Sequence, residues 1–297
     1  MFSGVIVPMI TPFEEDLSLD LDAARWLARW LADSQVSGIF PYSTTGEFVH
    51  LKEEEGLRLV EAVLDEVGGR VKVIPGISSN DTERAIELGR KMKDLGVDGV
   101  IATPPFFFKL KEDHLYLHFS RIAERVDLPL IVYNIPSLTG NMVPVNVYRR
   151  LVSEHSGVVG AKVTYDSVAY MRNLILEVKS IRKDFSVLTG LDDHLLNVLA
   201  MGGDGGIMAC ANFAPEIHVG IYRAFMEGDL ERAVELHRRL MKVVRVYDVA
   251  SSFPTAIKTA LSLMGTPIKP YVRPPLIEEP EEVVESIRRI LHSAEVA

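Results

Sequence analysis

The sequence predicts an α/β protein built as a (β/α)8 TIM barrel with a C-terminal three-helix extension. Short apolar runs of strand length recur roughly thirty residues apart, and segments with helical periodicity lie between them. The runs are almost continuously apolar, which is typical of parallel strands covered by helices. Eight such strand-helix units favour closure into a barrel.

Each apolar run has the length of a strand and is separated from the next by a helical segment. The expected strands are Gly4–Ile10, Gly38–Tyr42, Val71–Gly76, Gly99–Thr103, Pro129–Tyr133, Val158–Val163, Ser186–Gly190 and Gly205–Ala209. The helices between them carry end signals. The helix expected over 80–96, for example, has Asn80 or Asp81 as its N-cap and ends on Gly96.

After the eighth strand, helical segments follow one another with no strand between them. They cover 215–228, 229–248, 253–265 and 280–294. The first completes the barrel, so we expect a barrel domain over 1–228 that carries the active site. A helical extension over 229–297 is expected to pack on that barrel. The proline-rich connector before the last helix is expected to cross the surface as a strap.

Composition and charge argue against several classes of protein. The formal net charge is −9 with no basic block or stripe, which argues against a nucleic-acid partner. The single cysteine, Cys210, rules out an internal disulfide and fits a cytoplasmic location. The first residues have no basic start and too short an apolar run for a signal peptide or a membrane span.

Lys162 is the unusual residue of the run Val158–Asp166, because its neighbours are apolar and largely β-branched. An ammonium group stripped of water without a partner is costly. Side chains at the carboxyl ends of barrel strands face one mouth. Lys162, Tyr133, Thr44–Gly46 and Gly190 come from four such ends. This convergence favours an active-site lysine over one that extends to solvent.

A desolvated lysine suits imine formation with a carbonyl substrate. Only the neutral amine attacks, and apolar walls lower its pKa from about 10.4 toward neutrality. The protonated imine then accepts electrons from a neighbouring carbon–carbon bond, so no metal or other cofactor is expected. A tyrosine hydroxyl can move protons at the carbinolamine. The turn Thr44–Glu47 offers N–H groups and two hydroxyls to a substrate carboxylate.

Six motifs occur in order along essentially the whole chain and resemble those of one family. They are GxxxPxxTPF at Gly4–Phe13, TTGE at Thr44–Glu47, YNIPSLTG at Tyr133–Gly140, GAKVT at Gly160–Thr164, TGLDD at Thr189–Asp193 and GGDGGI at Gly202–Ile207. The sequence resembles the pyruvate-dependent class I aldolases and lyases, the family of dihydrodipicolinate synthase and N-acetylneuraminate lyase. The resemblance implies a Schiff base with pyruvate or a related 2-oxo acid, and commonly a homotetramer.

The resemblance also implies roles for individual residues. Lys162 is the Schiff-base lysine, Tyr133 is the proton donor and acceptor, and Thr44 extends the proton relay through its hydroxyl. Thr45 binds the substrate carboxylate. Two further residues line the pyruvate site, largely through main-chain groups: Gly190 and Ile207.

Two positions depart from the family's pattern. Phe107 stands where the family usually presents a relay tyrosine that reaches a neighbouring subunit's site, and a phenyl ring passes no proton. Leu138 stands where dihydrodipicolinate synthases typically carry an arginine for the second substrate's carboxylate. An apolar residue here resembles the sugar-acid aldolases and neuraminate lyases instead. The apolar loop Pro104–Phe108 is a candidate subunit contact.

Other residues are weaker candidates for a site. Asp192 and Glu47 are candidates for contact with substrate hydroxyls, although Glu47 could simply cap its own turn. His114 and His118 are spaced for a metal on one helix, but without a third ligand they are more typical of a solvated surface, so no metal is expected. The glycine-rich stretch 202–206 could suggest a phosphate-binding loop. It precedes the eighth strand, however, so we expect it at the end of the barrel opposite the active site.

The sequence therefore predicts a lyase that forms pyruvate and an aldehyde by reversible aldol cleavage. Its substrate would be a 2-keto-3-deoxy sugar acid or a similar 4-hydroxy-2-oxo acid. Three alternatives remain open. They are dihydrodipicolinate synthase of lysine biosynthesis, a dehydratase that uses the same imine, and a non-catalytic pyruvate-binding relative.

Overall fold

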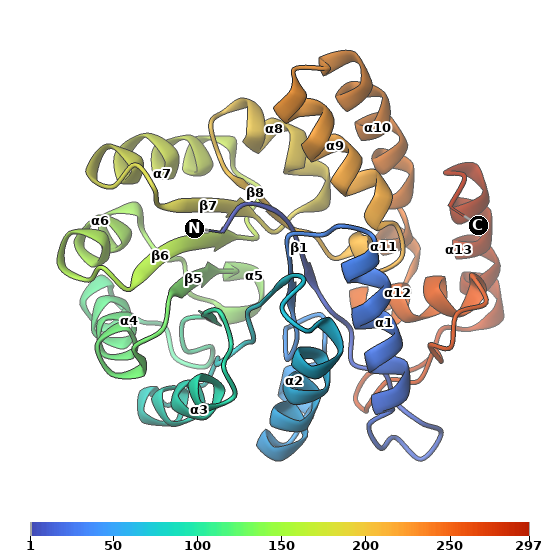
Figure 1. Cartoon of the computed structure of the whole chain (residues 1–297), viewed down its shortest axis with the longest axis horizontal. Coiled ribbons are helices and arrows are strands. Elements are labelled where there is room, and N and C mark those ends of the chain that lie inside the picture. The colour runs from blue at the N-terminus through green and yellow to red at the C-terminus, as the bar shows by residue number, and fades with distance from the viewer. Residues whose placement is uncertain (1, 297) are drawn as a thin grey trace. The chain divides into compact units, whose positions relative to one another are not determined.

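The computed structural model describes residues 2–296, and its strands and helices alternate along the chain (Figure 1). The strands are β1 (Gly4–Pro8), β2 (Gly38–Phe40), β3 (Lys72–Val73), β4 (Val100–Ala102), β5 (Leu130–Asn134), β6 (Val158–Val163), β7 (Ser186–Thr189) and β8 (Gly205–Ile207). Each coincides with one of the predicted runs, and only its ends differ. The predicted strands are therefore confirmed.

A helix or a short helical turn follows every strand. The helices up to the end of the barrel pattern are α1 (Leu21–Asp33), α2 (Glu53–Val67), α3 (Thr82–Asp94), α4 (Glu112–Val126), α5 (Pro136–Thr139), α6 (Val145–Glu154), α7 (Val168–Ile181), α8 (Leu195–Ala200) and α9 (Pro215–Glu227). Three 3-10 turns are η1 (Phe48–His50), η2 (Asp192–His194) and η3 (Cys210–Asn212). This alternation confirms the predicted (β/α)8 fold class.

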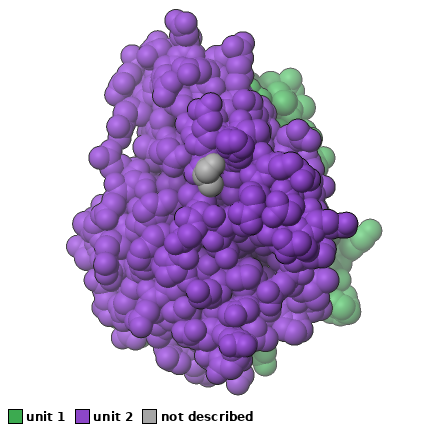
Figure 2. Space-filling model, turned by 90° about the vertical axis from the view of Figure 1, so that its right-hand side faces the viewer, with its two compact units in different colours: residues 1–4, 72–207 green, residues 5–71, 208–297 purple. Residues whose placement is uncertain are grey.

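The chain divides into two compact units, which Figure 2 distinguishes by colour. One consists of Met1–Gly4 with Lys72–Ile207, and the other of Val5–Val71 with Met208–Ala297. The domain boundary predicted at residue 228 falls inside the second unit. That boundary stays a prediction.

In the first unit, β4, β5, β6, β7 and β8 are consecutive parallel neighbours. The helices α3, α4, α6 and α7 lie outside these strands (Figure 1), with α3 packed against α4 and α6 against α7. All five residues of β5 are buried, and β6 is buried except for one partly exposed position. The register pairs Tyr133 with Lys162 and Lys162 with Leu188, so three strands present their carboxyl ends together.

In the second unit, β1 and β2 are parallel neighbours and α1 packs against α2. The C-terminal helices are α10 (Leu230–Val243), α11 (Val246–Val249), α12 (Phe253–Leu263) and α13 (Glu281–Ser293). The helix predicted over 229–248 is thus interrupted, as α10 ends at Val243 and α11 begins at Val246. Within this unit α10 lies against α9. Packing of the extension on the barrel stays a prediction.

The proline-rich connector 269–280, between α12 and α13, lies over the surface as expected of a strap, since all but one of its residues are exposed or partly exposed. Val272 is the buried one, and Arg273 is partly exposed. Within the part of the chain that the structure describes, no helix combines the length and the apolar character needed to cross a membrane.

Candidate active site

Lys162 lies in β6 with its side chain only 3% exposed, between Tyr133 of β5 and Leu188 of β7. Its neighbours on either side along the strand are fully buried. Burial lowers the pKa of Lys162 from 10.5 to about 7, and the Asp192 carboxylate opposes this shift. A large fraction of the amine is therefore neutral near pH 7, which is the form that attacks a carbonyl carbon.

Tyr133 forms a pair with this lysine. The Lys162 Nζ lies 3.9 Å from the centroid of the Tyr133 ring. The Thr164 Oγ1 donates a hydrogen bond of 3.2 Å to the Tyr133 hydroxyl. Thr164 thus orients the Tyr133 hydroxyl, a role that the sequence analysis did not predict. The role could have been predicted from its position two residues after Lys162, because side chains two apart on a strand share a face.

Gly190 follows β7 and lies against Lys162 and Thr164. A Cβ at this position would be 3.1 Å from the Lys162 Cε and 2.0 Å from the Thr164 Oγ1. The Gly190 N–H also donates to the Val163 carbonyl at 2.7 Å. Only glycine permits such a close approach, so Gly190 leaves room for the lysine and the threonine in their observed places.

Two further predicted residues lie in the same unit. Asp192 is buried in η2, and its charge acts on the amine of Lys162. Ile207 is the buried last residue of β8. Leu138, in the short helix α5, is 52% exposed and offers no charge to a substrate.

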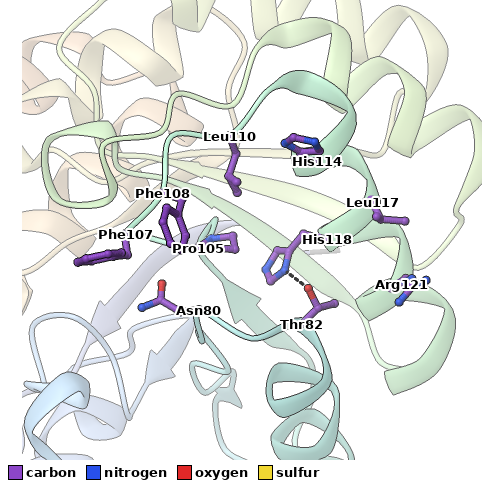
Figure 3. Close-up of a pocket in the computed structure, with 10 residues that line it drawn as sticks. All are labelled: Asn80, Thr82, Pro105, Phe107, Phe108, Leu110, His114, Leu117, His118 and Arg121. Carbon is purple, nitrogen blue, oxygen red and sulfur yellow. Dashed lines mark hydrogen bonds between the residues drawn. The ribbon is translucent and has the colours of Figure 1, made fainter.

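The loop with the predicted subunit contact lies on the surface. Phe107 is 81% exposed, and its ring meets that of Phe108 edge-on at 5.2 Å. Both line an open pocket beside α4 (Figure 3). His118 of this pocket is buried rather than solvated as expected, and its Nδ1 is 2.9 Å from the Thr82 Oγ1. Among residues 2–296, no group of three or more His, Cys, Asp or Glu side chains could hold a metal ion.

The turn Thr44–Glu47 lies in the second unit and follows β2. The Glu47 N–H donates to the Thr44 carbonyl at 3.1 Å, and the Gly46 N–H donates to the Ser43 Oγ at 3.0 Å. Two of the N–H groups expected to bind an anion are therefore used by the turn itself. Among residues 2–296, no main-chain carbonyl accepts a hydrogen bond from the N–H of Thr44 or Thr45. Binding of a substrate carboxylate at Thr45 stays a prediction.

Glu47 is 2% exposed, and both of its carboxylate oxygens are engaged. One oxygen lies 2.6 Å from the Lys258 Nζ, and the other accepts a 3.1 Å hydrogen bond from the Arg273 N–H. Contact between Glu47 and substrate hydroxyls stays a prediction. The other interpretation, in which Glu47 caps its own turn, is wrong, because its side chain makes no capping hydrogen bond to the helical turn η1 that follows.

The chain is similar to a known protein family along almost its whole length. The model of the dihydrodipicolinate synthetase family matches residues 1–294. A DapA-like lyase of Thermofilum pendens is 59% identical, covering 97% of this chain and 96% of the relative. A probable 2-dehydro-3-deoxy-D-pentonate aldolase of Escherichia coli, YjhH, is 39% identical over 98% of this chain and 96% of its own.

A solved structure extends the similarity to three dimensions. The crystal structure of YagE from Escherichia coli, a dihydrodipicolinic acid synthase family protein in complex with pyruvate, superposes with a TM-score of 0.97. The two sequences are 34% identical, and each chain is covered completely.

Proposed function

Because the chain belongs to the dihydrodipicolinate synthetase family of lyases, we propose that Lys162 forms a Schiff base with pyruvate or a pyruvate-yielding 2-oxo acid. The proposed reaction is reversible aldol cleavage of a 2-keto-3-deoxy sugar acid or a similar 4-hydroxy-2-oxo acid. The observation that carries the proposal is the buried amine of Lys162. Its pKa of about 7 leaves it nucleophilic, and the Tyr133 ring lies 3.9 Å away.

The reaction begins when the neutral amine adds to the C2 carbonyl of the substrate. The carbinolamine loses water to give a protonated imine, which withdraws electrons from the bond between C3 and C4. This bond breaks as the C4 hydroxyl loses its proton, so an aldehyde leaves and an enamine remains. Protonation of C3 and hydrolysis of the imine then release pyruvate and restore the amine.

The Tyr133 hydroxyl is the proposed proton carrier at the carbinolamine. It accepts a hydrogen bond from the Thr164 Oγ1, so its own proton is directed elsewhere and can be given to the reacting group. Thr44 remains the proposed extension of the relay. Thr45 is the proposed ligand of the substrate carboxylate, because its N–H donates to no main-chain carbonyl among the described residues and the same residue also carries a hydroxyl.

The aldehyde partner is proposed to be a sugar-derived aldehyde rather than an amino-acid semialdehyde. Leu138 supplies no positive charge for a second carboxylate, and a lost bidentate clamp weakens binding of such a substrate. The relatives YjhH and YagE, named as probable and putative aldolases of 2-dehydro-3-deoxy sugar acids, support this choice. We expect Asp192 to contribute to the selection of the aldehyde.

A homo-oligomer in the cytoplasm is the proposed working form. Phe107 and Phe108 expose large apolar rings, as expected of a surface that a second copy covers. We expect a tetramer, as in the family that the sequence resembles, with the subunit count measured by light scattering.

Reductive trapping tests the Schiff base directly. Incubation with pyruvate and borohydride should add one reduced pyruvate to the intact protein, and peptide mapping should locate it at Lys162. Lys258 is also buried, so the absence of an adduct there serves as an internal control. A panel of 2-keto-3-deoxy sugar acids should then release pyruvate, whereas aspartate semialdehyde should not be consumed. If the intact protein gains no reduced pyruvate adduct, the proposal is wrong.

The pH dependence of trapping should report the pKa of the lysine. Because the amine must lose its proton to attack, the initial trapping rate with pyruvate should rise with pH and reach half its maximum near pH 7. An ordinary exposed lysine would still be gaining reactivity at pH of about 10. A midpoint above pH 9 would show that burial does not activate Lys162.

Gly190→Ala is expected to disable the site without unfolding the protein. The added methyl would lie 2.0 Å from the Thr164 Oγ1, so Thr164 and Lys162 must move. Displacements of this size commonly cost about a hundredfold, which we expect in the second-order trapping rate with pyruvate. Gly157→Ala is the matched control, because its added methyl meets nothing closer than 3.7 Å. Equal rates in the two variants would contradict the close packing around Gly190.

A further inference from the structure

Glu47 links the turn Thr44–Glu47 to the C-terminal part of the chain. Its Oε1 lies 2.6 Å from the Lys258 Nζ, in α12, and its Oε2 accepts a 3.1 Å hydrogen bond from the Arg273 N–H in the connector. These residues are separated from Glu47 by 211 and 226 positions in the sequence. All of them belong to the second unit.

The Lys258 side chain is completely buried, and burial lowers the pKa of its amine to about 8, although the Glu47 carboxylate opposes this shift. Besides the Glu47 carboxylate, it donates to the Tyr271 carbonyl at 2.8 Å and lies 4.1 Å from the centroid of the Phe13 ring. A buried charge is tolerated only with such partners. These contacts fix the position of the Lys258 amine, and the amine in turn fixes the position of the Glu47 carboxylate.

Arg273 closes the cluster from the other side. Its guanidinium donates to both oxygens of Glu55, at 2.8 and 2.6 Å. It also donates to the main-chain carbonyls of Leu17 and His50. The pKa of Glu55 is lowered to about 2, chiefly by this hydrogen bonding. Two carboxylates thus balance two cations, so the cluster has no charge left over for a substrate.

The backbone at Glu47 explains why the turn needs this anchor. Its φ of 57° and ψ of 35° are in the left-handed region, which is unfavourable for a residue with a side chain. Such a conformation persists where the surrounding contacts hold it in place. At Glu47 the side chain contacts Lys258, Arg273 and the His50 Nδ1, which is 3.4 Å from the Glu47 Oε2, and the N–H donates to the Thr44 carbonyl.

We infer that Lys258 and Arg273 are positioning residues that hold the turn Thr44–Glu47 so that Thr44 and Thr45 can receive the substrate carboxylate. The inference rests on the proposed function, because it assigns the carboxylate to this turn. It makes the C-terminal extension part of the machinery that binds substrate. It also assigns Glu47 to the anchor rather than to the substrate.

The test compares Lys258→Met with the double variant Glu47→Gln/Lys258→Met. The double variant leaves no buried unpaired charge, so it keeps its fold even if the single variant does not. The readout is borohydride trapping as a function of pyruvate concentration. We expect the half-saturating concentration to rise about tenfold or more in both variants, because the turn is no longer held. The trapping rate at saturation should stay within about twofold, since Lys162 is unchanged.

Lys179→Met provides the matched control. Lys179 pairs with Asp204 at 2.8 Å, and both residues belong to the first unit, whereas the turn belongs to the second. The variant should leave the half-saturating pyruvate concentration unchanged. Hydrogen exchange measured by mass spectrometry should show faster exchange over 43–48 in the Lys258 variants and not in Lys179→Met.

Failure of the proposed function and failure of the positioning role give different experimental results. If the wild-type protein traps no pyruvate, the proposed function fails and takes this inference with it. If the wild type traps pyruvate and the folded double variant has the same half-saturating concentration and the same exchange over 43–48, the positioning role alone is wrong.

Discussion

Lys162→Met is expected to abolish aldol cleavage and borohydride trapping while making the protein more stable. Removal of a nucleophile that forms a covalent intermediate lowers kcat by a factor of about 10⁴ or more. The stability gain follows from burial, because the Lys162 amine is held in an environment that disfavours its charge. A gain in stability with loss of activity distinguishes an active-site lysine from a structural one.

The pH dependence of this gain has a definite sign. The folded state has a lysine pKa of about 7, whereas the unfolded chain has its ordinary value of 10.5. Between these values the unfolded chain binds more protons, so the wild type becomes more stable as pH rises from about 7 to about 10.5. Below pH 7 the full penalty applies, at most about 5 kcal/mol.

Urea unfolding at pH 6 and pH 9 checks the expectation. Lys162→Met should exceed the wild type in free energy of unfolding at both values, with the larger difference at pH 6. Lys179→Met should show no such gain, because its amine is partly exposed and paired. A Lys162→Met protein that still turns over substrate, or one that is less stable at pH 6, would contradict the buried nucleophile.

The second large effect is expected at the ion pair of Glu47 and Lys258. Lys258→Met should lower the free energy of unfolding by about 3–5 kcal/mol, because it leaves the Glu47 carboxylate buried and without its main partner. The double variant Glu47→Gln/Lys258→Met should recover most of that loss, since neither remaining group is charged. Chemical denaturation of the three proteins at one pH measures both values.

The ion pair of Lys179 and Asp204 again supplies the comparison. Its side chains are 21% and 26% exposed, whereas those of Lys258 and Glu47 are both 0% exposed. Removal of Lys179 should therefore cost only about 1 kcal/mol. If Lys258→Met lowers the free energy of unfolding no more than Lys179→Met does, the buried pair of Glu47 and Lys258 does not contribute to stability as its burial implies.

Much of the fold and the centre of the site could be predicted from sequence. Eight apolar runs set the strands, because burial of a parallel sheet requires apolar side chains on both of its faces. Lys162 stood out within its run because a charge among apolar residues is costly and needs a reason. Tyr133 followed from its place at the end of the neighbouring strand. The register that pairs these two residues bears out that neighbourhood.

The tertiary structure alone decided which side chains hold that centre in place. Thr164 and Gly190 acquire their parts only when the ends of β6 and β7 lie side by side. Lys258 is the only charged residue of α12, but the sequence does not say which residue pairs with it, and Arg273 lay in a connector expected on the surface. Local pattern reports whether a residue prefers the interior, since that preference belongs to its own chemistry. It does not report which distant partner satisfies a buried charge, because that depends on contacts across more than 200 residues of chain, such as the 211 between Glu47 and Lys258.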